Sequence, residues 1–255
     1  MSGTRWGLMF TLCLMGCNGS NDDDNGPAIG DPALERIVLE VSYEPGAEPY
    51  TGPSPIGGDT WALFENNMAA LFVGTGVTIE NPNTLDEMGQ IPEQDGQSFD
   101  VDRLLALDEA YRDTAATDSS RVYHAIWVDG YFADENGQNR GVIGVSIGNT
   151  GVIAMFKPVI ESIGLTEGVR RFSEQTTLIH EVGHAVGLVN NGLEMQSAHQ
   201  DEENGAHCDD DECVMFWANE GVGDIAEFVS RFITDGETVL FDDDCLSDVQ
   251  SAFDQ

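Results

Sequence analysis

Two histidines and a glutamate in the segment His180–His184 have the types and spacing of a zinc-binding site. His180 and His184 are four residues apart, so at roughly 3.6 residues per turn both imidazoles leave one face of a helix. They could then reach one ion at the roughly 2.0–2.1 Å of a zinc–nitrogen bond. Glu181 would lie beside the metal, where a carboxylate can take a proton from activated water and pass it to a leaving amine. The pattern predicts a hydrolytic zinc centre with Glu181 as catalytic base and acid.

The residues around this motif argue against a chance occurrence. Apart from the motif itself, no charged side chain occurs from Thr176 to Leu188, as expected for a buried helix. Gly187 follows where the helix must end, and glycine adopts the left-handed conformation of a helix end at little cost. A second segment with histidine, cysteine and methionine, His207–Met215, follows close behind.

The motif resembles the signature of the metzincin clan of zinc metalloproteases, HExxHxxGxxH. His180, Glu181, His184 and Gly187 match it, whereas Asn190 stands where the third histidine belongs. Amides are unusual zinc ligands, so the third ligand must come from elsewhere or be missing. Asn190 is expected to shape the turn after the helix.

The segment His207–Met215, HCDDDECVM, fits the HCx4CxM pattern that completes the signature in archaemetzincins. The simplest interpretation is an insertion, Asn190–Ala206, ahead of the third histidine. The chain also resembles a group of bacterial lipoprotein metalloproteases that carry such an insertion. The resemblance is specific over residues 176–217, and elsewhere it covers only the order of strands and helices.

The resemblance implies that His207 is the third zinc ligand and that Met215 is the Met-turn residue, an apolar floor beneath the site. His199 is the alternative third ligand. The competing interpretation of His199 is a loop histidine that Asp201 holds in place and that binds no metal. Archaemetzincins also carry a second, structural zinc on cysteines that include a CxxC pair. This chain has only Cys245 downstream, which counts against a second zinc.

Three cysteines fall in the part of the chain expected to fold, Cys208, Cys213 and Cys245. An oxidising compartment allows one disulfide among them and leaves one thiol over. Cys208 and Cys213 are close enough in sequence to close a short loop, so we expect that pairing, which would brace the same loop as the structural zinc. A thiolate–zinc site there would require a reducing compartment.

The N-terminal residues have the pattern of an export signal. Arg5 precedes the apolar run Trp6–Met15, which is too short to cross a bilayer as a helix. The run ends in Leu14-Met15-Gly16-Cys17, which resembles a bacterial lipobox. The competing interpretation is an ordinary signal peptide with an incidental cysteine.

We therefore expect three parts: a signal peptide over residues 1–16, a flexible tether over 17–32 lipidated at Cys17, and a metallopeptidase domain over 33–255. The acidic, Gly- and Pro-containing composition of residues 18–32 suits a tether. Acyl chains on Cys17 would anchor the protein to the bacterial cell envelope, facing the periplasm or the surface.

The charge balance is strongly acidic, with 46 acidic against 10 basic residues and a formal net charge of −36. Such a field repels nucleic acid and anionic lipids, so we exclude a nucleic-acid partner and expect a peptide or protein substrate. The membrane would be reached only through the lipid anchor, and a monomer is expected. A weak calcium site is a further hypothesis from the excess of carboxylates.

The elements that must position the motif can be placed from hydrophobic periodicity and from Gly and Pro punctuation. The strands are expected at residues 37–43, 77–80, 121–127, 141–147 and 152–159, and the helices at residues 61–72, 100–115, 168–187, 224–232 and 244–253. Residues 81–97 are expected to form a loop. His124, alone in its strand, is expected to be structural.

This order predicts an α+β domain with a small mixed β-sheet, a long helix that carries the motif and a loop-rich C-terminal part. The resemblance to metzincins implies that this is a zincin- or metzincin-like fold with a central active-site helix. In zincins the strand before the active-site helix often forms the sheet edge that holds an extended substrate, and Gly148–Phe156 is expected to serve this way. The predicted activity is that of a zinc-dependent endopeptidase. The alternative is a surface-binding lipoprotein that keeps the fold without turnover, suggested by Asn190 and the tether, although the intact Glu181 argues against it.

Overall fold

The computed structural model describes residues 25–54, 57–164, 166–220, 225–235 and 238–254. The expected signal peptide and Cys17 lie outside these residues. Among the described residues, no helix is both long and apolar enough to cross a membrane.

The fold is mixed α/β, with the site helix packed against a mostly parallel sheet in the strand order β2-β1-β5-β9-β8. β3 pairs with the far end of β1, and β8 is the antiparallel member. The strands of this sheet are β1 (Arg36–Tyr43), β2 (Thr78–Glu80), β3 (Gly89–Gln90), β5 (Ser120–Val128), β8 (Gly144–Ser146) and β9 (Val152–Phe156). A small second sheet contains β4 (Ser98–Phe99), β6 (Tyr131–Asp134) and β7 (Gly137–Asn139).

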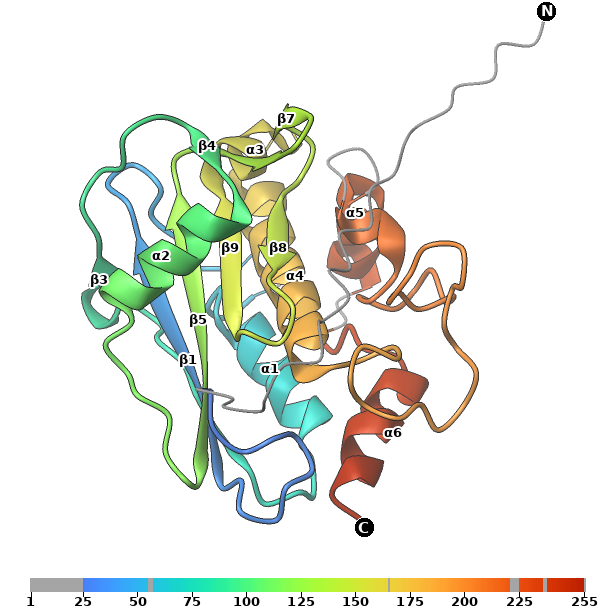
Figure 1. Cartoon of the computed structure of the whole chain (residues 1–255). Coiled ribbons are helices and arrows are strands. Elements are labelled where there is room, and N and C mark those ends of the chain that lie inside the picture. The colour runs from blue at the N-terminus through green and yellow to red at the C-terminus, as the bar shows by residue number, and fades with distance from the viewer. Residues whose placement is uncertain (1–24, 55–56, 165, 221–224, 236–237, 255) are drawn as a thin grey trace, which may run out of the picture.

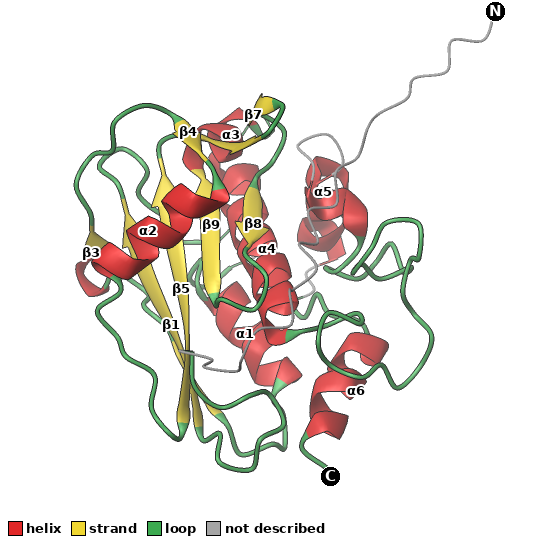
Figure 2. Cartoon of the chain, in the orientation of Figure 1, coloured by secondary structure: helices red, strands yellow, loops and turns green. Residues whose placement is uncertain are grey.

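Helices cover both faces of the larger sheet (Figures 1 and 2). α2 crosses one face, and α1 and α4 pack on the other, while α5, α6 and long loops lie beyond α4. The α-helices are α1 (Ala62–Leu71), α2 (Val101–Tyr111), α3 (Lys157–Ser162), α4 (Glu167–Val186), α5 (Ile225–Asp235) and α6 (Asp243–Ala252), and the 3-10 turns are η1 (Leu85–Glu87) and η2 (Trp217–Glu220). From Gly187 to Phe216 the chain is mainly loop, as expected for a loop-rich C-terminal part.

The central strand β5 shows why the sheet lies in the core. It pairs in parallel with β1 on one side and β9 on the other, and all nine of its residues are buried. A parallel strand covered on both faces must be nearly continuous in buried residues. Its histidine is satisfied: His124 Nδ1 lies 2.8 Å from Asp108 Oδ1, and Nε2 lies 2.9 Å from Ser42 Oγ. The structural role expected of His124 agrees with these contacts.

Three expectations about the strands and loops were wrong. The strand expected over Val152–Val159 ends at Phe156, and Lys157 begins α3 with Pro158 in its first turn. Proline lacks the N–H that a strand needs, whereas the first turn of a helix tolerates it. This strand, β9, is also internal, because the antiparallel β8 pairs outside it and forms the sheet edge. The loop expected over residues 81–97 contains η1 and β3.

The last residues of the expected tether are packed against the domain. Asn25 is buried, its carbonyl accepts from Val122 N at 3.0 Å, and its side-chain amide donates to Asn149 O at 3.1 Å. Gly26 lies so close to Ser120 that a Cβ would stand 2.1 Å from its carbonyl oxygen. Asn25 and Gly26 are therefore not part of a flexible segment. The expected boundary at residue 33 was drawn from composition alone, which does not show these contacts.

Candidate metal centre

Helix α4 carries the motif and is fixed at both ends. The Thr166 side chain caps its N-terminus by accepting from Val169 N at 3.3 Å, and Gly187 ends it with φ 104°. From Phe172 onward nearly every residue is buried, between the sheet on one side and α5 on the other. The predicted helix is thus present, and burial on both sides leaves its histidines little rotational freedom.

The two motif histidines meet on one face of α4. His180 Nε2 and His184 Nε2 lie 3.0 Å apart, with ring centroids 4.6 Å apart. Two nitrogens that share a tetrahedral zinc ion would be roughly 3.3 Å apart, given zinc–nitrogen bonds of roughly 2.0–2.1 Å. The pair therefore needs little movement to share an ion.

His207 completes a group of three. Its ring centroid lies 5.3 Å from that of His180 and 5.0 Å from that of His184, and one nitrogen from each ring lies within 4.8 Å of the others. His199, the alternative third ligand, does not belong to this group. It lies in a separate cluster with Cys208, Asp242 and Cys245.

Backbone carbonyls orient two of the three rings. His180 Nδ1 lies 2.7 Å from Val214 O, and His207 Nδ1 lies 2.6 Å from Asn204 O. A carbonyl can only accept, so both Nδ1 atoms carry hydrogen and both Nε2 atoms offer a lone pair. Lone pairs that converge in a buried site are suited to a cation, so this donor set fits zinc.

Glu181 lies where α4 approaches the sheet edge. Its side chain is buried, and a Cβ on Gly144 of β8 would stand 3.1 Å from Glu181 Cγ and 2.9 Å from Thr177 Cγ2. Only glycine at residue 144 lets the edge strand come this near the helix. The Glu181 side chain thus packs against the sheet edge that β8 forms.

Met215 packs directly beneath the motif. It is fully buried, and a Cβ on Gly183 would stand 2.4 Å from its Sδ atom. Its carbonyl accepts from Cys208 N at 2.9 Å, which ties it to the residue after His207. Met215 is thus an apolar contact beneath the helix that carries the motif.

Asn190 follows α4 in the left-handed region, with φ 60°, after Val189 at φ 52°. Its amide donates to Gln200 Oε1 at 3.1 Å, a partner within the inserted segment. This agrees with a turn-shaping role.

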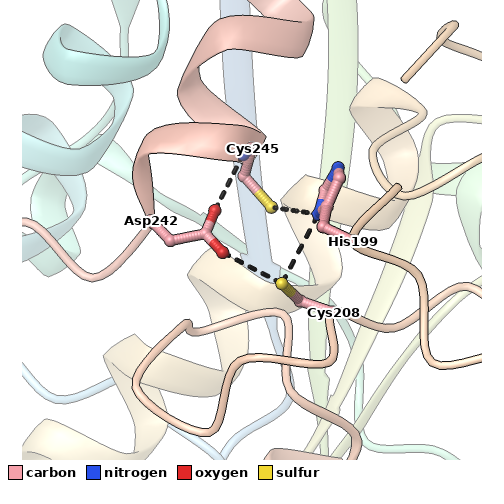
Figure 3. A group of neighbouring side chains, drawn as sticks. All are labelled: His199, Cys208, Asp242 and Cys245. Atoms are coloured by element: carbon pink, nitrogen blue, oxygen red, sulfur yellow. Dashed lines mark hydrogen bonds between the residues drawn. The ribbon is translucent and has the colours of Figure 1, made fainter. Parts of the chain in front are cut away.

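The second convergent group, shown in Figure 3, contains His199, Cys208, Asp242 and Cys245. Within the described residues, Cys208, Cys213 and Cys245 are buried and none is in a disulfide, so the expected Cys208–Cys213 disulfide is not formed. Cys213 Sγ lies 3.7 Å from Cys245 Sγ instead, and Cys208 is directed at His199. The physical reason is that α6 brings Cys245 to the loop, which spacing in the sequence cannot show.

Burial and contact shift the pKa values in this second group. Burial and the hydrogen bond with Cys208 raise the pKa of Asp242 to about 6. Burial would lower the pKa of His199, but its hydrogen bonds with Cys208 and Asp248 outweigh that effect and raise it to about 9. The group is a tightly coupled polar cluster within the protein interior.

Sequence reasoning missed Asp242 and Asp248. Asp242 is partly buried and caps α6 by accepting from Cys245 N at 2.7 Å. Its place three residues before a cysteine, at the start of a helix, is the signal that was available. Neither convergent group among the described residues is made of carboxylates alone, so the structure gives no support for the calcium hypothesis.

No protein-family model and no curated protein matches this chain. Among solved structures, the chain is similar to a zinc-dependent peptidase from Methanocorpusculum labreanum. That match has 14% identity and a TM-score of 0.46, and it covers 83% of this chain and 99% of the other. We therefore base the assignment that follows on the chain's own residues.

Proposed function

We propose that this protein is a zinc-dependent endopeptidase that uses His180, His184 and His207 as metal ligands. One observation carries the proposal: three imidazoles from two distant segments converge, and a buried glutamate adjoins the first of them. A structural zinc site normally uses four protein ligands, whereas three leave a position open for chemistry. The arrangement favours a catalytic ion.

Zinc held there would supply a Lewis acid that makes water more acidic and polarises a peptide carbonyl. Glu181, the residue after the first ligand, would accept a proton from the attacking water and later donate it to the departing amine nitrogen. Val214 O and Asn204 O hold the imidazoles of His180 and His207 in the tautomer in which Nε2 would be the metal-binding atom. Met215 fills the space beneath the helix and keeps that side of the site apolar.

The edge strand β8 supports a peptide as substrate. It is the outermost strand beside β9, and Gly144 brings it against Glu181. Val145 and Ser146 are partly exposed. An extended peptide added to this edge by backbone pairing would run past the carboxylate and the three histidines, which suits endopeptidase cleavage.

The test is peptide hydrolysis by the wild type and by Glu181→Gln, each assayed after zinc loading and after chelation. We expect the substitution to reduce kcat by roughly a hundredfold to ten-thousandfold while zinc content stays at the wild-type level. Chelation should abolish the wild-type activity, and added zinc should restore it. Glu109→Gln, an exposed change of the same kind on α2, is the matched control.

Equal rates for the wild type and Glu181→Gln would contradict the proposal. Stoichiometric zinc without any hydrolysis across a library of peptides would favour the alternative, a binding protein that keeps the site without turnover. His207→Ala should lose the ion held by the motif, whereas retention of that ion would remove His207 from the ligand set.

A further inference from the structure

We infer that His199, Cys208, Asp242 and Cys245 form a second metal site, one that takes a thiophilic divalent ion such as zinc and that positions the loop carrying His207. Four donor atoms, one from each side chain, lie within 4.8 Å of one another. Four protein ligands are the usual complement of a structural zinc site. The link to His207 rests on the proposed function, whereas the site itself does not.

The distances within the group match those of a tetrahedral ion. With bonds of roughly 2.3 Å to sulfur and 2.0–2.1 Å to nitrogen, the edge between the two donors would be roughly 3.6 Å. His199 Nδ1 lies 3.4 Å from Cys208 Sγ and 4.0 Å from Cys245 Sγ. Figure 3 shows both sulfurs directed toward the imidazole from different segments of the chain. A centrally placed ion would require only small shifts.

Asp248 prepares His199 as a ligand. Its Oδ2 lies 2.9 Å from His199 Nε2, and both side chains are almost fully buried. A carboxylate on one ring nitrogen fixes the tautomer and raises the basicity of the other, which is how outer carboxylates support metal-bound histidines. The nitrogen that remains, Nδ1, is the one that faces the sulfurs. His199 and Asp248 thus have the arrangement of a metal-binding histidine and its supporting carboxylate.

Asp242 can serve the ion and the helix together. Its Oδ1 caps α6 by accepting from Cys245 N at 2.7 Å, which leaves Oδ2 directed at Cys208 Sγ at 2.9 Å. Binding a divalent ion would release to solvent the thiol protons of Cys208 and Cys245 and any proton on His199 Nδ1. The two thiolates, the carboxylate and the neutral imidazole would then surround the ion with a net charge of −1, an acceptable balance for a buried site.

The second site adjoins the first through one peptide bond. Cys208 follows His207, and its amide donates to Met215 O at 2.9 Å beneath the catalytic helix. His199 O accepts from Asp209 N at 2.9 Å, and Asp201 N donates to His207 O at 2.8 Å. An ion that fixes Cys208 against α6 therefore also fixes the backbone that presents His207.

A disulfide is the competing state of these thiols. Cys213 Sγ lies 3.7 Å from Cys245 Sγ, so an oxidant could join this pair and remove Cys245 from the metal. Bound metal would protect the thiolates from that reaction. Thiol counting and metal analysis of the same sample separate the two states.

The first experiment measures metal in the wild type, purified with a reductant and loaded with zinc. We expect about two equivalents per chain, because each group holds one ion. Replacement by Co²⁺ should give thiolate-to-cobalt charge-transfer absorption, which three imidazoles cannot produce. About one equivalent of metal, without thiolate charge transfer, would overturn the second site, as would a Cys213–Cys245 disulfide in fully loaded protein.

The second experiment assigns the ligands. His199→Ala, Cys245→Ser and Asp242→Asn should each lose one ion and weaken or abolish the thiolate–cobalt absorption, whereas His184→Ala should lose an ion and keep that absorption. Ser197→Ala is the matched control: it removes the 2.7 Å hydrogen bond to Asp244 on α6 and should keep both ions. If Asp242→Asn kept the second ion and Cys213→Ser lost it, Asp242 would be overturned as the fourth ligand.

The third experiment tests the link to His207. In Cys245→Ser, the affinity of the remaining ion, measured by competition with a chelator, should fall roughly tenfold or more, as for other changes to the support of a metal ligand. An unchanged affinity would overturn the positioning role but leave the second site standing. Inactivity of a wild type that holds both ions would count against the proposed function alone.

Discussion

At the scale of single residues, each functional side chain is held by a partner that restricts its chemistry. Val214 O and Asn204 O set the tautomers of His180 and His207, and Asp248 does the same for His199. His124 has the same residue type but no converging ligands, because Asp108 and Ser42 occupy its two nitrogens. The hydrogen-bond partners of the two ring nitrogens, more than the residue type, thus distinguish the candidate metal ligands from a structural histidine.

Asp108 offers a prediction about stability and pH. Burial would raise the pKa of Asp108, but hydrogen bonds from His124 and Arg112 outweigh burial and lower that pKa. A lowered pKa in the folded state contributes stability above the unfolded value of roughly 3.9, and that contribution is lost as pH falls through the folded value. Asp108→Asn should therefore reduce the free energy of unfolding by roughly 1–3 kcal/mol at neutral pH.

The measurement is urea unfolding of the wild type and Asp108→Asn at neutral pH and below roughly pH 3. The difference in stability should shrink in acid, while the exposed change Glu109→Gln on the same helix should have little effect at either pH. A difference that stayed constant across this range would show that the carboxylate's charge is not the cause.

At the scale of elements, the site depends on close approaches to α4 from two sides. Gly144 lets β8 reach Glu181, and Gly183 lets Met215 pack beneath the histidines. Glycine inside a helix normally costs roughly 0.5–1 kcal/mol relative to alanine. Gly183 is nevertheless needed inside α4, because a side chain there would collide with Met215.

Gly183→Ala should therefore destabilise the protein despite the better helix propensity of alanine. The new Cβ would stand 2.4 Å from Met215 Sδ and 3.4 Å from Leu188 Cδ1, and overpacking of a buried site costs roughly 1–3 kcal/mol. Thermal unfolding should show a lower Tm, and zinc affinity should fall as Met215 is displaced. Gly168→Ala, in the partly exposed first turns of α4, should be neutral or stabilising. Equal behaviour of the two variants would show that Met215 adapts without cost.

At the scale of the whole molecule, a sheet with helices on both faces holds α4, and the C-terminal loops and α6 bring the remaining donors to it (Figure 1). The two groups of metal-binding side chains share the segment around His207 and Cys208. The C-terminal part is thus the piece that closes both sites, which makes its attachment to α4 essential for metal binding.

We propose that the protein is exported and anchored to the bacterial cell envelope through Cys17, which the apolar run Trp6–Met15 and the lipobox-like sequence support. Cys17→Ala should move the protein from the membrane to the soluble fraction, because the acyl chains would have no attachment site. Cys13→Ala, inside the apolar run, is the control and should remain with membranes. Fractionation that does not differ between these two variants would contradict lipidation at Cys17.

The sequence by itself determined the site helix, most strands of the larger sheet and the local chemistry of the motif. Periodicity located α4 and most strands of the larger sheet, because buried faces repeat every 3.6 or 2 residues. The i, i+4 spacing placed His180 and His184 on one face, since helix geometry alone decides which side chains are neighbours. The resemblance of residues 207–215 to a known pattern favoured His207 over His199 as the third ligand.

Only the tertiary structure decided what long-range packing brings together. The sequence left His199 as a rival to His207, and the fold separates them into two groups. The spacing in the sequence predicted a Cys208–Cys213 disulfide, whereas in the structure α6 brings Cys245 and Asp242 to the loop that carries Cys208. Proximity within a helix follows from the chain, but proximity between a loop and a helix more than thirty residues later depends on how both pack against the core.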